Sequence, residues 1–200
     1  MGKIAVDVVL LPSQEATNQV IEANKRLLKQ DSDQIILGKI SCLPHISLAM
    51  GCLDKQDIPI IEKILYTIAG KYNPSQLNIA GISIGTNALG EKVSSFEVKK
   101  TDNLRLLHEE VMRRTTAYFS YDVTEEMVLS PPTAGESTLL WIKNYPDNSA
   151  FSNFSPHITI GYGQLDEFPF TAEFTASKLA LCHLGNHCTC RKILAAAELG

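Results

Sequence analysis

The sequence lacks long apolar runs, a surplus of positive charge and low-complexity segments. No stretch approaches the roughly 18 apolar residues of a membrane-spanning helix, and the early run from Ile4 to Leu11 is interrupted by Asp7. With 18 Lys and Arg against 22 Asp and Glu, the net charge of −4 argues against a protein that coats long duplex nucleic acid. We therefore expect no membrane and no long duplex as partners, whereas a local cluster of donors can still bind a small anion.

Cysteine is also scarce, with five residues in a chain of 200. An odd and sparse set does not fit a secreted disulfide framework, so we predict reduced thiols and a cytoplasmic protein. The run Cys182-His183-x3-His187-Cys188-x-Cys190 contains zinc-ligand types but lacks the spacing of a zinc knuckle. Strand alternation would also send Cys188 and Cys190 to the face opposite His187. We predict no metal and no cofactor, and the expected compartment disfavours a disulfide between these two strands.

Hydrophobic periodicity predicts three helices among about eight strands, with no linker to divide residues 1–200 into separate domains. The expected helices cover residues 13–30, 54–70 and 102–120. The expected strands cover residues 3–11, 77–85, 93–98, 138–145, 157–162, 174–183 and 187–194, with one strand passing into another across 35–50. Residues 121–137 and 146–155 are expected to be loops. This order indicates an α+β fold with a mostly antiparallel sheet.

One internal repeat carries most of the functional information. Residues 44–51 read P-H-I-S-L-A-M-G and residues 156–163 read P-H-I-T-I-G-Y-G, so Pro, His, Ile and the final Gly recur at the same offsets. A bare H-x-[ST] is a weak signal, because His187-Cys188-Thr189 has it too. The shared flanking residues nevertheless favour a duplicated half-domain with a pseudo-two-fold relation over two unrelated strand histidines.

Strand geometry gives this repeat a chemical meaning. Side chains alternate along a strand, so His45 and Ser47 are expected on one face, as are His157 and Thr159 in the second copy. If the two copies meet in one cleft, one neutral imidazole can act as base while the other, protonated, acts as acid. The two hydroxyls can donate hydrogen bonds to phosphoryl oxygens and stabilise developing charge.

Paired H-x-[ST]-h motifs in an α+β chain of this length resemble the two-histidine phosphoesterases, which include the 2′-5′ RNA ligase and cyclic phosphodiesterase families. The resemblance implies two mostly antiparallel sheets in two lobes around a central groove, with helices on the outside. It also implies metal-independent hydrolysis, or reversible ligation, of a 2′,3′-cyclic phosphate or a 2′-5′ phosphodiester of a nucleotide or RNA end. Carried over by motif position, His45 and His157 would be the acid/base pair, and Ser47 and Thr159 would bind the phosphate.

Several other residues have two interpretations. Phe151, Phe154 and Tyr162 lie near the second motif and can contact a base or a phosphate, although the two phenylalanines can equally anchor a loop to the core. Tyr162 stands where many members of the resembled family carry a basic residue. His108 lies four residues after Leu104 on an expected helix, which favours a core-edge position over catalysis.

Two further functions use the same sequence features. A module that binds RNA ends or nucleotide phosphates with little turnover would need the same motif residues as the enzyme. A zinc-organised protein would depend on the C-terminal cysteines and histidines instead. We expect a monomer, and the near-equivalence of the two motif copies leaves the acid and the base unassigned at this stage.

Overall fold

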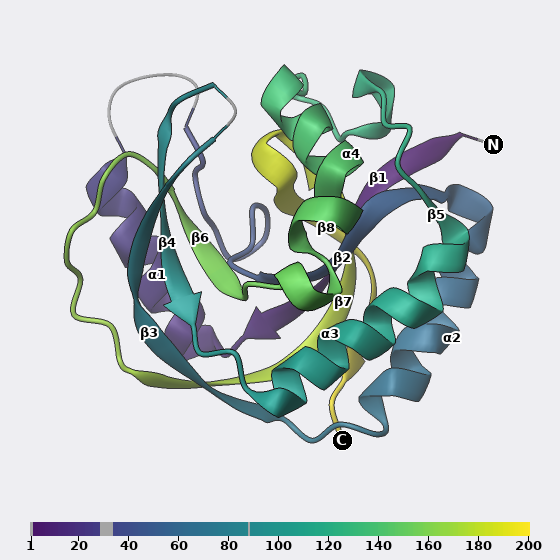
Figure 1. The fold of residues 1–200 in the computed structure, drawn as a ribbon, viewed down its shortest axis with the longest axis horizontal. Coiled ribbons are helices and arrows are strands. Elements are labelled where there is room, and N and C mark those ends of the chain that lie inside the picture. The colour runs from purple at the N-terminus through teal and green to yellow at the C-terminus, as the bar shows by residue number, and fades with distance from the viewer. Residues whose placement is uncertain (1, 29–33, 88) are drawn as a thin grey trace.

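The structure, a computed structural model, describes residues 2–28, 34–87 and 89–200 (Figure 1). These residues form an α+β fold with four α-helices and eight strands, as the sequence predicts for the class. The elements are β1 (Lys3–Pro12), α1 (Gln14–Leu27), β2 (Ile46–Asp54), α2 (Ile58–Ala69), β3 (Ser75–Thr86), β4 (Lys92–Val98), α3 (Asp102–Thr115), β5 (Phe119–Ser120), α4 (Glu136–Ser149), β6 (His157–Tyr162), β7 (Glu173–Gly185) and β8 (Thr189–Glu198). None of the described helices has the length and apolarity needed to cross a membrane.

The strands are joined in the order β5-β2-β1-β7-β3-β4-β6, with β8 paired to β7, and every pair of these strands is antiparallel. Two separate sheets are not confirmed. The reason is that β3 changes partner along its length: residues 75–78 pair with β7, and residues 79–86 pair with β4. This strand connects the part of the sheet that holds β2 to the part that holds β6, which are the strands of the two repeated motifs.

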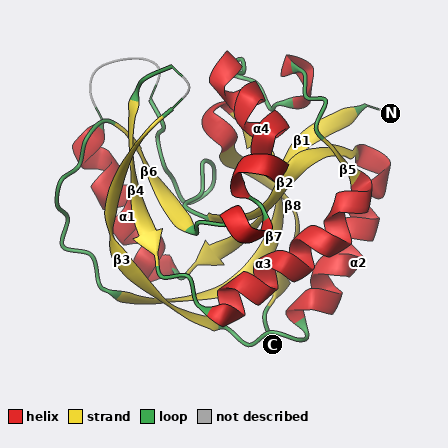
Figure 2. Cartoon of the chain, in the orientation of Figure 1, coloured by secondary structure: helices red, strands yellow, loops and turns green. Residues whose placement is uncertain are grey.

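The core is centred on β1, a run of apolar residues buried on both faces. Such a continuous run is typical of a strand with neighbours on both edges and both faces. Ser13 accepts a hydrogen bond from the backbone N–H of Ala16 (3.3 Å) and so begins α1 directly after β1. Helix α1 packs against β6, while α2 and α3 lie side by side at the opposite end of the view in Figure 2.

The expected strand over residues 138–145 is wrong, because residues 136–149 form helix α4. The buried side chains of this helix are Thr138, Ile142 and Tyr145, which recur every three to four residues and define one helix face. The adjacent apolar residues 139–141 hide that period in the sequence. The helix continues through Pro146, so the first part of the loop expected over 146–155 is also helical.

The other differences concern element boundaries. Residues 35–45, all of them described, form no strand of their own, and only Leu43 makes an isolated bridge, to Cys190. The N–H of Leu37 and the carbonyl of Ile35 bond instead to the buried side chain of Asn24 (3.1 and 2.8 Å). Helix α3 is capped by Thr101 and ends at residue 115 rather than near 120, and residues 29–30 of the first expected helix lie outside the described residues.

The expectation that all thiols are reduced is also wrong for one pair, since Cys182 and Cys190 form a disulfide across the β7–β8 hairpin. Their Cα atoms lie 5.5 Å apart. The pairing of β7 with β8 shifts between residues 181 and 184, and the register pairs Cys182 with Ile193 and Cys190 with Leu184, so the disulfide joins two residues that are not direct partners in the sheet. Cys42, Cys52 and Cys188 are free thiols.

Replacing both Cys182 and Cys190 by serine is expected to lower the free energy of unfolding by about 2–3 kcal/mol, because a cross-link restricts the unfolded chain. The two positions are 8 residues apart, which places the effect at the modest end for disulfides. Urea denaturation of the oxidised wild-type protein and the double variant measures the difference, with Cys42→Ser as a control. Equal midpoints for the wild-type protein and the double variant would contradict this expectation.

Candidate active site

Both repeated motifs line one pocket of about 390 Å³. His45 comes directly before β2 and His157 is the first residue of β6, and the hydroxyls of Ser47 and Thr159 line the same pocket. The alternating residues of both strands, Ile46 and Leu48 in β2 and Ile158 and Ile160 in β6, are fully buried in the core. The structure therefore brings together the four residues that the repeat singled out.

The two histidine rings are oriented by the same local hydrogen bond. Nδ1 of His45 donates to the carbonyl of Leu43 (2.7 Å), and Nδ1 of His157 donates to the carbonyl of Ser155 (2.9 Å). A carbonyl oxygen only accepts, so the proton of each neutral ring is on Nδ1 and the lone pair is on Nε2. The proline between each histidine and its acceptor keeps the preceding residue extended, which explains why the P-H pair is repeated.

The electrostatic environment of the first histidine is unusual. Burial lowers the pKa of His45, and the neighbouring His157 lowers this pKa further, although the bond to the Leu43 carbonyl opposes both effects. A charged imidazole loses its hydration when it is buried, so the neutral form is favoured. His45 therefore presents a neutral ring with a lone pair on Nε2 at neutral pH.

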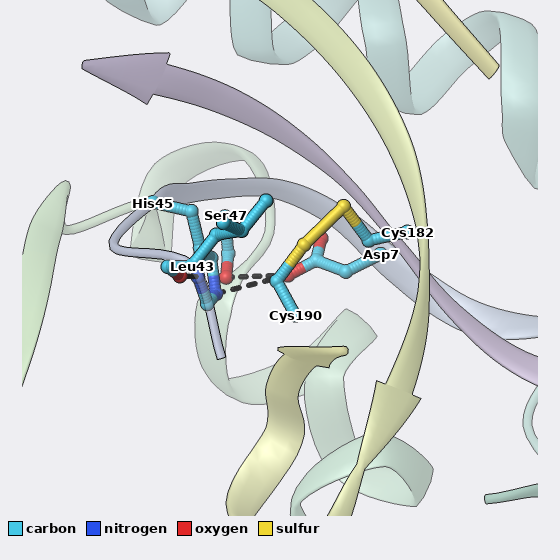
Figure 3. The surroundings of a disulfide bond; sticks show 6 residues. All are labelled: Asp7, Leu43, His45, Ser47, Cys182 and Cys190. Atoms are coloured by element: carbon cyan, nitrogen blue, oxygen red, sulfur yellow. Dashed lines mark hydrogen bonds and ion pairs between the residues drawn. A yellow bond between two sulfur atoms is a disulfide. The ribbon is translucent and has the colours of Figure 1, made fainter. Parts of the chain in front are cut away.

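The acid that interrupts the first apolar run lies beneath this histidine (Figure 3). Asp7 is fully buried on β1, and its Oδ2 is hydrogen-bonded to the Ser47 hydroxyl (2.6 Å). The same Oδ2 lies 3.9 Å from Nε2 of His45. Burial raises the pKa of Asp7 well above the ordinary value, and hydrogen bonds from Ser47 and from the backbone of Ala49 reduce this effect only in part. We did not expect Asp7 at the site from the sequence, although an acid inside an apolar strand is a signal of a special site.

The aromatic residues near the second motif have different positions. Tyr162 lines the pocket, and its hydroxyl is hydrogen-bonded to Nδ1 of His187 (2.8 Å). Phe154 is buried at the pocket edge and stacks on His108 with ring centroids 3.9 Å apart. Phe151 lies outside the pocket lining and is 43 % exposed. The structure thus brings Tyr162 and the edge of Phe154 to the site and leaves Phe151 apart.

His108 is a buried connector between the two motifs. Its Nδ1 donates to the carbonyl of Leu48 in β2 (2.8 Å), and its Nε2 accepts from the N–H of Phe151, in the short helical turn that precedes β6 (2.8 Å). Both ring nitrogens are therefore engaged in the neutral form. Burial lowers the pKa of His108 to about 4, and this connection holds the loop before the second motif against the strand of the first.

Helix α4 and the hairpin β3–β4 supply pocket residues that the sequence analysis missed. Trp141 and Asn148 come from α4, as does Tyr145, an aromatic residue that we also expected as a possible base contact, and Trp141 remains 46 % exposed. Trp141 and Asn148 were not expected at the site because this segment was predicted to be a strand followed by a loop. Glu97 of β4 also lines the pocket, opposite His157 in the sheet register. Among the described residues, no Lys or Arg lines this pocket.

The C-terminal cysteines and histidines do not converge on a metal site. Cys182 and Cys190 are consumed by their disulfide, and His187 lies in the turn η5 (Asn186–Cys188), outside the strand in which we expected it. His183 bonds instead to the carbonyl of Met127 (3.0 Å). Over the described ranges, no group of three or more His, Cys, Asp or Glu is placed to hold a metal ion.

Comparison with solved structures relates this architecture to known proteins. The chain is similar to TT0787 of Thermus thermophilus, with 17 % identity, a TM-score of 0.60 and 98 % of each chain covered. It is also similar to a phosphoesterase, with 11 % identity, a TM-score of 0.57 and 98 % of each chain covered. E. coli LigT complexed with 3′-AMP matches with 12 % identity and a TM-score of 0.53, over 97 % of this chain and 96 % of LigT.

No protein-family model and no curated protein matches the sequence. At 11–17 % identity the structural similarity establishes the fold. The fold is shared with solved structures that include a phosphoesterase and E. coli LigT.

Replacing His108 by glutamine is expected to flatten the dependence of stability on pH. The pKa of His108 is about 4 in the folded protein, whereas an unperturbed histidine in the unfolded chain has a pKa near 6.5. The contribution of His108 to the free energy of unfolding is therefore complete above pH 6.5 and is lost as the pH falls toward 4. The loss amounts to about 3 kcal/mol over this interval. Urea unfolding at pH 7 and pH 4.5 compares the two proteins, and equal pH dependence would show that His108 is not neutral in the fold.

Proposed function

We propose that this protein is a metal-independent phosphoesterase that acts on a 2′,3′-cyclic phosphate or a 2′-5′ phosphodiester of a nucleotide or RNA end. The observation that carries the proposal is the pair of motif histidines in one pocket, each with Nδ1 bonded to a carbonyl and Nε2 left as the reactive nitrogen. The fold of known phosphoesterases supports this proposal.

The different environments of the histidines suggest their roles. His45 is neutral because burial lowers its pKa, so its Nε2 can accept a proton from water as the water oxygen attacks phosphorus. His157, in its doubly protonated imidazolium form, then donates its Nε2 proton to the ribose oxygen as the bond from phosphorus to that oxygen breaks. In ligation, a 5′-hydroxyl replaces water as the attacking group, and the same two proton transfers open the cyclic phosphate and form the diester. Thr159, and Ser47 when its proton is free, would donate to the phosphoryl oxygens.

The charge of the pocket favours a particular class of phosphate. No Lys or Arg lines it in the described part of the chain, whereas the Glu97 carboxyl is in its wall. Hydroxyl donors, together with the protonated form of His157, can bind the single negative charge of a diester or cyclic phosphate. A terminal phosphate carries nearly two charges and would meet stronger repulsion from Glu97. The pocket therefore supports a diester substrate and ready release of a monoester product.

Replacing His45 or His157 by alanine is expected to lower turnover of a 2′,3′-cyclic nucleotide by roughly 10²–10⁴-fold, because each variant removes one of the two proton-transfer groups. Turnover by the wild-type protein is expected to be unaffected by EDTA. His183→Ala is a suitable control, since this ring bonds outside the pocket. Full activity in either motif variant would contradict the proposal, and binding of the nucleotide without turnover by the wild-type protein would indicate a binding module instead.

Replacing Trp141 by alanine is expected to raise KM for a cyclic nucleotide by roughly 10-fold with little change in kcat, because a base stacked on an aromatic side chain contributes about 1–3 kcal/mol. Ribose 2′,3′-cyclic phosphate, which has no base, should show no such increase. Leu140→Ala removes a neighbouring exposed side chain of α4 that does not line the pocket, and it serves as the matched control. An equal rise in KM for both substrates would assign Trp141 to a different role.

A further inference from the structure

The buried carboxyl beneath the first motif has no use in the proton transfers described above. Asp7 lies next to His45 and Ser47 of the first motif, and it interacts electrostatically with Tyr145 of α4 and with Cys188 of the turn η5. The disulfide between β7 and β8, which does not titrate, also lies beside Asp7 (Figure 3). This carboxyl is 0 % exposed and borders a pocket proposed to bind an anion.

The hydrogen bonds of Asp7 are those of a neutral acid rather than of a carboxylate. An ionised carboxylate offers about four lone-pair positions, yet Oδ1 has no hydrogen-bond partner, and the hydrogen bonds of Asp7 are to Ser47 and to the backbone of Ala49. The nearest basic nitrogen, Nε2 of His45, is 3.9 Å away, which is too far for a hydrogen bond. A buried charge with so few partners is costly, and protonation removes the cost.

The neighbours of Asp7 do not supply a compensating charge. Burial lowers the pKa of His45, so its ring is neutral at neutral pH. Burial raises the pKa of the Tyr145 hydroxyl and of the Cys188 thiol, so both stay protonated. With these three neighbours uncharged, a negative charge on Asp7 would have no compensating charge beside a bound phosphate.

The protonation state of Asp7 decides what Ser47 can do. If Asp7 is ionised, it takes the only proton of the Ser47 hydroxyl, and Ser47 then presents lone pairs to the pocket. If Asp7 is protonated, the same 2.6 Å contact can run the other way, from the acid O–H to Ser47 Oγ. The Ser47 proton is then free to turn toward a phosphoryl oxygen. Thr159, the equivalent hydroxyl, faces Ser95 across β4 and β6 instead of an acid.

Building on the proposed function, we propose that Asp7 is a positioning residue: as a neutral acid it donates a hydrogen bond to Ser47 and so turns the Ser47 hydroxyl toward the substrate phosphate. No bond is made or broken in this step, and the Asp7 proton stays on Asp7. The two motifs are thereby unequal, because only the first has a hydroxyl whose direction depends on a second residue.

Substitutions at Asp7 that keep or remove a donor test this proposal. Asp7→Leu is expected to raise KM for a 2′,3′-cyclic nucleotide by roughly 10-fold, the effect of one lost hydrogen bond to an anion. Asp7→Asn, which keeps a donor without charge, is expected to recover KM to within about 3-fold of the wild-type value. In a Ser47→Ala background, neither substitution should change KM further, because Asp7 acts through Ser47. A loss in Asp7→Asn as large as in Asp7→Leu would overturn the proposal, since it would require the charged carboxylate.

A second measurement does not depend on turnover or on the folding of any variant. The infrared spectrum of the wild-type protein at neutral pH is expected to contain the C=O stretch of a protonated carboxylic acid, which exposed carboxylates do not give. Absence of this band would overturn the role of Asp7. If the band is present but no cyclic or 2′-5′ phosphate is turned over, the proposed function fails while the neutral state of Asp7 stands.

Discussion

Burial of β1 between β2 and β7 is the constraint on which the rest of the structure depends. Its apolar side chains leave no face for solvent, so both of its edges must be paired and both of its faces covered. Pairing on one edge fixes β2 and with it the first histidine motif. Pairing on the other edge fixes β7, and the β7–β8 hairpin carries the turn η5 to the wall of the pocket. The site is therefore assembled by the same strand pairing that builds the core.

The parts of this arrangement that depend on local periodicity could be predicted from the sequence. Ile46 and Leu48 alternate with polar residues, as do Ile158 and Ile160. This alternation predicts that the histidine and the hydroxyl of each motif lie on the same face of their strand, as the structure shows. Helix α4 could not be predicted in this way, because its apolar residues are consecutive in the sequence. Which of its side chains are buried, every three to four residues, is decided by packing. The contact between Asp7 and Ser47 could not be predicted either, because the two residues are 40 positions apart in the sequence. They come together only through the pairing of β1 with β2.

Three buried neutral polar side chains fix the segments that the strands alone do not hold. Asn24 bonds to the carbonyls of Ile35 and Ile160 (2.8 and 2.7 Å), and His108 joins β2 to the turn before β6. Asn186 accepts from the N–H of Gly135 and from the hydroxyl of Thr138, and so holds the start of α4 on the hairpin tip. Removing any one leaves buried partners unsatisfied at a cost of about 1–3 kcal/mol each. Because these connectors carry no charge, they position the segments that line the pocket without adding to the electrostatic field of the pocket.

No Lys or Arg lines the described part of the pocket, and the buried connectors are uncharged. The protonation state of each motif histidine therefore depends on its local environment. The repeat gives both histidines the same ring orientation, which alone would make them interchangeable. The fold then treats them differently: His45 stands above a buried acid in the centre of the sheet, whereas His157 opens an outer strand opposite Glu97. Desolvation keeps the first ring neutral and able to accept a proton. In the proposed mechanism, a duplicated motif supplies both an acid and a base because the position of each strand in the sheet, rather than the motif itself, sets the environment of its histidine.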